Sequence, residues 1–180
     1  MAHIVRGAWT TRCSENIHGH SYQFELFLEG DFPDQGQMLY DFGLIKKYMN
    51  DFFDSFDHAI MLKSTDTKLV EFCSEQCMRV LVVPFNPTAE MQAKFIFFVC
   101  SKILETVGTK NMAKNVSVHK VIVHETATGY GEYSVNDMQT DKFPDIDYLN
   151  VKYSEGVMKE WSSNLWHKQI LKDTLPSDKS

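Results

Sequence analysis

The sequence predicts an α+β domain with a mainly antiparallel sheet, and three observations support this fold class. Residues 21–29, SYQFELFLE, alternate apolar and polar side chains with the period of a half-buried strand. Residues 115–135 contain two further strand-like runs, separated by small residues around Gly129. Two segments, 42–56 and 90–107, instead repeat apolar residues at helical spacing. Because strands and helices occur in blocks, an α+β arrangement is favoured over a parallel one.

The other expected elements rest on shorter patterns. Residues 2–5, AHIV, are typical of a short first strand, and residues 38–40, MLY, of another. Asp41 is the expected N-cap of the first long helix, and Asn86 or Thr88 that of the second. The remaining expected elements are a weaker helix over 68–77, a buried strand over 79–83 and an amphipathic helix within 154–171.

Composition places the chain among ordinary globular proteins. With 180 residues, 43% of them hydrophobic, it can bury one core, and we expect a domain over 1–137 followed by an extension over 138–180. The net charge is −6 and the basic residues are scattered, which argues against a nucleic-acid partner. No apolar run reaches the about 18–20 residues of a membrane span, and no signal peptide is recognisable. We therefore expect a cytoplasmic protein with reduced cysteines and no membrane partner.

The segment CSENIHGHSY, residues 13–22, carries the strongest chemical signal. His18 and His20 are two positions apart at the entry of a strand, so both side chains can reach one metal ion. If residues 2–6 pair antiparallel with residues 18–22, His3 joins them. A single strand histidine is more often structural, but three histidines without a carboxylate leave a fourth position open. That pattern is typical of catalytic rather than structural zinc.

Further candidates lie outside the histidines. Cys13 is either a fourth metal ligand or an activated thiol, since a nearby dication lowers the pKa of a thiol in both roles. Asp57 and His58 end the Phe-rich helix, where a carboxylate can orient an imidazole, and with Cys13 they can form a proton relay. Glu125 lies on an apolar strand face and needs a partner. That partner is either a structural arginine or a ligand edge that donates two N–H groups.

Five segments, in this order, resemble the 6-pyruvoyl-tetrahydropterin synthase / 6-carboxy-tetrahydropterin synthase family: CSENIHGHSY, MLYDFGLIKKYM, FDHAIML, NPTAE and VHETATGYGEY. The resemblance covers residues 1 to about 135. It implies the tunnelling fold, an antiparallel four-stranded sheet with two main helices. In that fold the sheets are joined into a barrel by oligomerisation, usually as hexamers.

The resemblance also implies a role for each candidate residue. A zinc ion would be the cofactor, and its ligands would be His3, His18 and His20. Cys13 would be the catalytic cysteine, with Asp57 and His58 as relay partners. Glu125 would anchor the pterin ring, Thr126 would contact it, and Thr88 would reach it from an adjacent subunit.

Members of this family act on 7,8-dihydroneopterin triphosphate. We favour the carboxy type, which forms 6-carboxy-5,6,7,8-tetrahydropterin, acetaldehyde and triphosphate on the 7-deazaguanine route to queuosine, because HGHSY, YDFG and SFDHA resemble bacterial members. The pyruvoyl type, which eliminates triphosphate on the tetrahydrobiopterin route, is the alternative. A non-catalytic zinc- or pterin-binding relative is a third interpretation. Cys13 and the Asp57–His58 pair argue against it, since binding alone requires neither.

Overall fold

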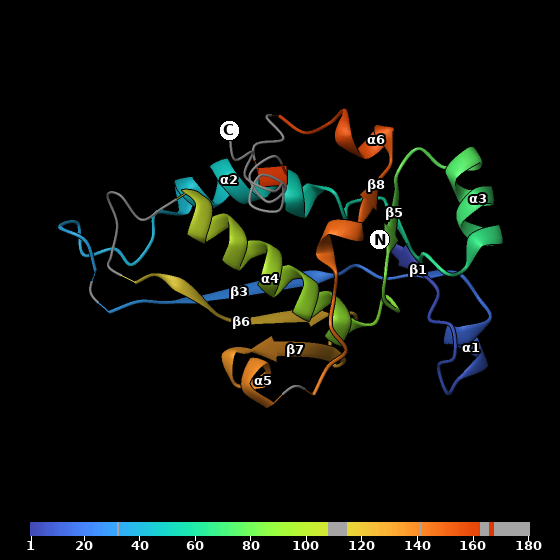
Figure 1. The fold of residues 1–180 in the computed structure, drawn as a ribbon, viewed down its shortest axis with the longest axis horizontal. Coiled ribbons are helices and arrows are strands. Elements are labelled where there is room, and N and C mark those ends of the chain that lie inside the picture. Colours follow the sequence, from blue (N-terminus) through green and yellow to red (C-terminus); the bar gives the residue numbers. More distant parts are fainter. Residues whose placement is uncertain (32, 108–114, 141, 163–165, 168–180) are drawn as a thin grey trace, which may run out of the picture.

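The computed structural model describes residues 1–31, 33–107, 115–140, 142–162 and 166–167. Its strands form two sheets, with the long helices α2 and α4 beside them (Figure 1). In chain order the elements are β1 (Ala2–His3), α1 (Thr11–Ser14), β2 (His18–Gly19), β3 (Gln23–Glu29), α2 (Phe42–Asp54), β4 (Ile60–Lys63), α3 (Thr67–Gln76), β5 (Val80–Val83), α4 (Ala89–Val107), β6 (Ser117–His124), β7 (Tyr130–Ser134), α5 (Val135–Thr140), the 3₁₀ turn η1 (Tyr148–Asn150), β8 (Lys152–Tyr153) and α6 (Glu155–Met158).

The first sheet is antiparallel and has the order β3-β6-β7, as the alternating patterns of these segments predict. Helix α4 packs on β6 and β7, and its first residues lie very close to β7 (Figure 1). At Gly131 a Cβ atom would lie only 2.6 Å from the Ala89 carbonyl carbon, so a side chain there would push helix and strand apart. This close contact fixes the start of α4 next to the end of β6.

The pairing of β3 with β6 contains a β-bulge: the register shifts between Phe27 and Leu28, and His119 of β6 is the extra residue. This shift changes which face of the sheet the side chains of β6 occupy. Regular alternation would place His119 and His124 on opposite faces. Instead, both imidazoles reach glutamates of β3: His119 Nδ1 lies 2.8 Å from Glu29 Oε2, and His124 Nε2 lies 2.5 Å from Glu25 Oε1. The bulge inserts one extra residue in β6 and so places both histidines on the face turned away from α4.

The second sheet differs from the expected four-stranded antiparallel one. It has five strands in the order β2-β1-β4-β5-β8, and β4 pairs in parallel with both β1 and β5. The strand over 60–63 was not predicted. Ile60, Met61 and Leu62 are all buried, so the sequence shows a short continuous apolar run rather than the alternation that marks a half-buried strand.

Two other expected elements are corrected. Residues 38–40 form no strand: the Met38 N–H donates to Asp34 Oδ1, and Asp34 N–H donates back to the Met38 carbonyl, which makes a local turn without a partner strand. The expected continuous helix within 154–171 is interrupted: residues 155–158 form a single turn preceded by the strand β8, residues 161–162 are not helical, and residues 166–167 are helical again. Residues 163–165 and 168–171 of that expected helix lie outside the described residues.

The main core lies between α2, α4 and the first sheet, and the segment after residue 140 contributes to it. Phe52 is fully buried, with ring centroids 5.2 Å from Phe56, 5.7 Å from Phe95 and 5.0 Å from Trp166. Trp161 Nε1 donates to Ser55 Oγ at 2.8 Å. The C-terminal segment therefore packs on the same core as the residues of the family resemblance.

Replacing Phe52 with alanine is expected to lower the free energy of unfolding by about 3–5 kcal/mol, because the ring leaves a cavity among neighbours from three segments of the chain. Urea denaturation followed by circular dichroism measures the loss. Phe72, 59% exposed on α3, is the matched control, and its replacement should change the free energy by about 0.5 kcal/mol or less. Equal losses for both variants would contradict this account of the core.

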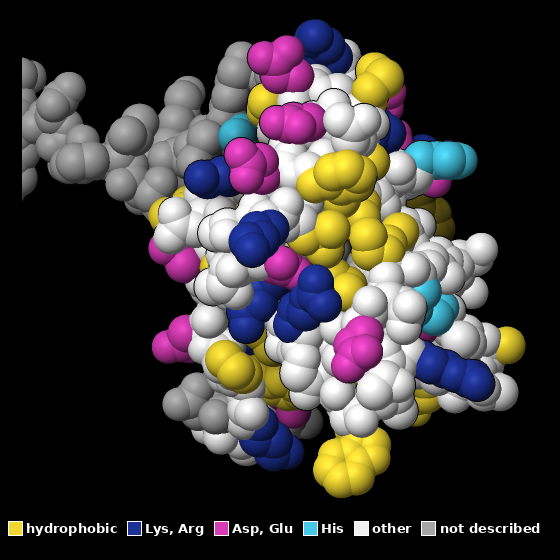
Figure 2. Space-filling view, turned by 90° about the vertical axis from the view of Figure 1, so that its right-hand side faces the viewer, with side chains coloured by type: hydrophobic (Ala, Val, Ile, Leu, Met, Phe, Trp, Pro, Cys, Tyr) yellow, Lys and Arg dark blue, Asp and Glu magenta, His cyan; other side chains and the backbone are white. Residues whose placement is uncertain are grey.

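One face of the molecule carries α1 and α3 and exposes several hydrophobic side chains among charged ones (Figure 2). Exposed apolar residues of these parts of the chain are Trp9, Phe72 and Met78. Basic and acidic side chains are interspersed on this face, without a continuous basic surface (Figure 2). Within the described ranges, no helix combines the length and the apolar character that crossing a membrane requires.

Candidate metal and pterin site

The predicted pairing of the first strand with the HGH segment brings three histidines together. Strands β1 and β2 are antiparallel with Ala2 opposite Gly19 and His3 opposite His18. One ligand nitrogen from each of His3, His18 and His20 lies within 4.8 Å of the others.

Backbone carbonyls determine which nitrogens of the histidines carry protons. His3 Nδ1 lies 2.6 Å from the Pro87 carbonyl oxygen, and His18 Nδ1 lies 3.0 Å from that of Asn16. A carbonyl oxygen can only accept, so each Nδ1 donates its hydrogen and each Nε2 presents a lone pair. The two Nε2 atoms are 3.1 Å apart. Facing lone pairs at this distance repel each other unless a cation lies between them.

This arrangement fits a zinc ion. Histidine nitrogens bind zinc at about 2.0–2.1 Å, which places two ligands of a tetrahedral site about 3.3 Å apart. Hydrogen bonds from Nδ1 to carbonyls are the outer contacts that orient histidine ligands. Burial lowers the pKa of His3, which is 1% exposed, so the neutral form that a metal requires is favoured. The cluster therefore has the donor set and proton positions of a three-histidine metal site.

Glu125 lies beside this cluster. It follows β6, and its Oε1 atom is 3.9 Å from His3 Nε2. The Tyr22 hydroxyl donates to the same oxygen at 3.1 Å. Burial raises the pKa of Tyr22 above its usual range, so the phenol keeps its proton. The arginine that would be the structural partner of Glu125 is not found among its described contacts.

The hydroxyls of the two threonines of the predicted pterin site both accept from local backbone N–H groups. Thr126 Oγ1 accepts the Gly129 N–H at 2.9 Å and closes the turn after β6. Thr88 is at the N-cap position of α4, where its Oγ1 accepts from Met91 N–H at 3.3 Å. Thr88 also follows Pro87, the residue that holds His3. The chain neighbours of the two threonines, Pro87 and Glu125, therefore both lie next to His3.

The Asp57–His58 pair is present as predicted but is exposed. His58 Nδ1 and Asp57 Oδ2 are 2.9 Å apart, and the two side chains are 86% and 74% exposed. The hydrogen bond from His58 lowers the pKa of Asp57. His58 has a left-handed backbone with φ of 49°, and Arg79 Nε donates to the Asp57 carbonyl at 2.7 Å, which fixes the turn.

A cavity of about 440 Å³ lies between this pair and His20, the one histidine of the cluster among its lining residues. Asp57 and His58 line it together with His20 and Tyr22, and the rings of Phe24, Phe53 and Phe56 form an apolar wall. The cavity combines an apolar surface for a flat ring with titratable groups at its margin. This is the expected character of a small-molecule site.

Cys13 lies apart from these groups within one chain. It belongs to α1, is a half-buried free thiol, and does not line the cavity of about 440 Å³. In the described part of the chain, it is not in the group of ligand atoms that lie within 4.8 Å of one another. Within one chain, the structure brings Cys13 neither into the histidine cluster nor into the cavity lined by Asp57 and His58, and its role stays a prediction.

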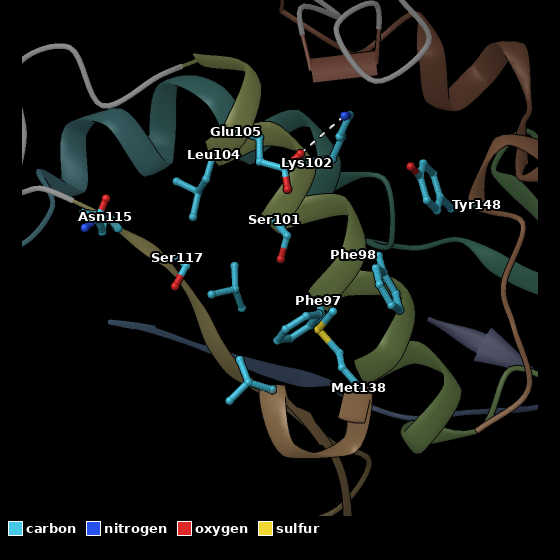
Figure 3. Close-up of a pocket in the computed structure, with 13 residues that line it drawn as sticks. Phe97, Phe98, Ser101, Lys102, Leu104, Glu105, Asn115, Ser117, Met138 and Tyr148 are labelled. Atoms are coloured by element: carbon cyan, nitrogen blue, oxygen red, sulfur yellow. Dashed lines mark hydrogen bonds and ion pairs between the residues drawn. The ribbon is translucent and has the colours of Figure 1, made fainter. Parts of the chain in front are cut away.

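A second cavity, of about 530 Å³, lies at the other end of α4 (Figure 3). Phe97, Phe98 and Ser101 point into it from α4, and Met138 and Tyr148 approach from the segment after β7. Its charged residues Lys102 and Glu105 pair with each other at 3.4 Å. None of the predicted site residues lines this cavity, so it gives no competing explanation of the candidate site.

Two residues of the site were not predicted from the sequence. Tyr22 was interpreted as an apolar member of the alternating strand, although its position two residues after His20 places it on the metal-binding side. Gln92 lies in the helix predicted over 90–107, to which the sequence assigned no site residue. It is fully buried, and its Nε2 donates to the Pro87 carbonyl at 3.0 Å. A polar residue in an otherwise apolar helical segment is the signal that could have found it.

Comparison with solved structures identifies the fold. An uncharacterized protein from Wolinella succinogenes superposes with a TM-score of 0.59 at 17% identity, covering 74% of this chain and 92% of that one. A catalytic-residue mutant of 6-pyruvoyltetrahydropterin synthase from Plasmodium vivax superposes with a TM-score of 0.53 at 15% identity, covering 73% and 87%. The fold and the histidine cluster define a tunnelling-fold protein with a site suited to a metal ion.

The sequence profile of the 6-pyruvoyl tetrahydropterin synthase family matches residues 1–136, and the chain belongs to this family. A protein of Helicobacter pylori named 6-carboxy-5,6,7,8-tetrahydropterin synthase is 32% identical over 174 residues, which cover 96% of this chain and 87% of that one. The protein of the same name from Aquifex aeolicus is 34% identical over 122 residues, 66% of this chain and 74% of that one. The likeness to the Helicobacter protein continues into the segment after residue 137.

Proposed function

We propose that this protein is a zinc-dependent lyase that converts 7,8-dihydroneopterin triphosphate into 6-carboxy-5,6,7,8-tetrahydropterin, with release of acetaldehyde and triphosphate. The product belongs to the 7-deazaguanine route to queuosine. The observation that carries the proposal is the cluster of His3, His18 and His20 with Glu125 next to it. The choice of the carboxy product rests on the names of relatives that align over nearly the whole chain.

Glu125 is the residue that we assign to the pterin ring. A carboxylate accepts two hydrogens, and the 2-amino group and N3 of a pterin present two donors side by side. Oε1 of Glu125 already accepts from Tyr22, which fixes the orientation of the carboxylate. The hydroxyl protons of Thr126 and Thr88 are free to contact the ring, because each oxygen accepts from a backbone N–H.

The zinc ion that the three histidines would hold supplies Lewis acidity toward the hydroxyls of the substrate side chain, which makes the attached C–H groups more acidic. Cys13 is the base that we assign to the removal of such a proton, since a thiolate is an effective acceptor near neutral pH. Asp57 orients His58 through the 2.9 Å contact, so that the imidazole can give or receive a second proton. The rings of Phe53 and Phe56 exclude water from one side of the cavity.

We further propose that the active site is completed between subunits of a homo-oligomer, in the family manner a hexamer. The support is that Asp57 and His58 are exposed and that Cys13 does not line the cavity with them. Strands β3 and β7 are also the two edges of the first sheet, and unpaired edges favour strand pairing with another copy.

We expect the protein to elute as a hexamer, or at least as a trimer or tetramer, in size-exclusion chromatography with light scattering. Dilution to the monomer should abolish turnover, because no single chain brings Cys13 together with the Asp57–His58 pair. A monomer that retains full turnover would contradict the completion of the site between subunits.

Incubation of the zinc-loaded protein with 7,8-dihydroneopterin triphosphate tests the proposed reaction. Acetaldehyde, trapped as its hydrazone, and 6-carboxytetrahydropterin are the expected products. Triphosphate without acetaldehyde would instead identify a 6-pyruvoyl-tetrahydropterin synthase. Binding without conversion would identify a non-catalytic relative.

A further inference from the structure

We propose that Tyr22 is a positioning residue, which fixes the Glu125 carboxylate for its pterin ligand, and that the buried amide of Gln92 orients Tyr22. This inference rests on the proposed function, because it takes the ligand of Glu125 from it. Neither residue is part of the catalytic or metal-binding set described above.

The Tyr22 hydroxyl lies between His3 of the histidine cluster and the Glu125 carboxylate. It is 3.1 Å from Glu125 Oε1, 3.2 Å from His3 Nδ1 and 3.4 Å from His3 Nε2. The Tyr22 and Glu125 side chains come from positions 103 residues apart, at the start of β3 and after the end of β6. One phenol oxygen therefore touches both the first metal-ligand candidate and the carboxylate assigned to the pterin.

The hydrogen of this hydroxyl can be placed from its neighbours. His3 Nδ1 carries a proton that it donates to Pro87, so it cannot accept from Tyr22. The lone pair of His3 Nε2 is directed at His18, 3.1 Å away. The Glu125 carboxylate can only accept, and it is the acceptor closest to the hydroxyl. The Tyr22 O–H group therefore donates to Glu125, and its oxygen is left to accept a hydrogen bond.

Gln92 is the donor that we assign to that hydrogen bond. Its side chain is 0% exposed, and Nε2 donates one hydrogen to the Pro87 carbonyl at 3.0 Å. The amide keeps a second hydrogen, which we assign to the Tyr22 oxygen. The buried Oε1 atom of Gln92 has no hydrogen-bond partner among the described residues. A buried amide with an unpaired acceptor destabilises a fold, so stability alone does not explain a glutamine here.

The contacts form a directed chain from Gln92 through Tyr22 to Glu125. Hydrogen bonds in such a chain, inside a region of low polarity, strengthen one another. The chain also holds Glu125 at 3.9 Å from His3 Nε2, where it lies near the histidines without binding in their place. Glu125 is 29% exposed, so without the hydroxyl its carboxylate could rotate away from the position that suits the ring.

The test uses a double-mutant cycle on the zinc-loaded, full-length protein, with neopterin as the fluorescent pterin probe. Tyr22→Phe should raise the Kd of neopterin about tenfold, the effect of one hydrogen bond to a charged group, with zinc content unchanged. In the Glu125→Gln background the same substitution should change Kd by less than about twofold, because Tyr22 acts through Glu125. In turnover, Tyr22→Phe should act mainly on KM rather than on kcat.

Gln92→Leu should raise Kd by a smaller factor, about threefold, and this effect should disappear in the Tyr22→Phe background. Tyr48→Phe on α2 is the matched control and should change neither Kd nor zinc content. Additive effects of Tyr22→Phe and Glu125→Gln, or loss of zinc from Tyr22→Phe, would overturn the positioning role. A wild-type protein that binds no neopterin would overturn the proposed function itself and the ligand assigned to Glu125.

Discussion

Replacing His18 with alanine is expected to remove stoichiometric zinc from the protein. The Nε2 atoms of His3 and His18 lie 3.1 Å apart with their lone pairs facing. Alanine at position 18 removes the imidazole and leaves only two of the three ligand nitrogens. Loss of an outer contact to a metal ligand costs about 10–100-fold in affinity, and loss of a ligand should cost more. Atomic absorption after dialysis measures zinc content, and competition with a chelator measures the affinity.

The matched control for this change is His119→Ala. His119 lies on the opposite face of the first sheet from α4 and pairs with Glu29 at 2.8 Å, away from the cluster. It should keep wild-type zinc. Added zinc should also raise the unfolding temperature of the wild type and of His119→Ala but not of His18→Ala, since a ligand that binds only the folded state stabilises it. Wild-type zinc content in His18→Ala would place the metal elsewhere.

The second prediction with a large expected effect compares two variants, one that should lose turnover and one that should lose pterin binding. Cys13→Ala is expected to lower turnover by about 10²-fold or more, the usual contribution of a positioned acid–base group, while pterin binding and zinc content persist. Glu125→Gln is expected to weaken pterin binding by about 1.5–3 kcal/mol, or roughly 10- to 150-fold in Kd, because a charged acceptor is lost. Single-turnover kinetics and direct titration with neopterin distinguish the two results.

Two controls make these results specific. Cys77→Ala, at an exposed thiol after α3, should leave turnover unchanged. Zinc content should be equal in Cys13→Ala, Glu125→Gln and the wild type. Loss of zinc from Cys13→Ala would identify Cys13 as a fourth ligand, and the site would then be closed and without a thiol base.

The sequence predicts the fold where one physical signal dominates. The alternation in 21–29 predicts β3, and Asp41 begins α2 as expected, with its side chain accepting from the Gly43 N–H at 2.7 Å. Strand β4 was not predicted because its apolar residues on both faces of the sheet are buried, so its sequence shows no alternation of apolar and polar residues. The expected C-terminal helix is interrupted around Trp161, because Val157 packs on the core from the single turn α6 and Trp161 packs on it from the loop that follows.

The metal cluster was predictable because it depends on local geometry. Two histidines at alternate strand positions share a face, and antiparallel pairing of AHIVR with HGHSY adds His3. The contribution of Tyr22 could not be read in the same way, since its partner Glu125 lies 103 residues away. The position of Cys13 relative to Asp57 and His58 depends on how chains meet, which no local pattern records.

The pairing of β8 with β5 affects the order in which parts of the protein can fold during synthesis. Leu81 pairs with Tyr153, Trp161 bonds to Ser55, and the Trp166 ring lies 5.0 Å from that of Phe52. A nascent chain on the ribosome can form the histidine cluster early, but it cannot cover Phe52 or complete the second sheet until residues 151–166 have emerged. Partly synthesised chains should therefore expose apolar surface and be substrates for chaperones.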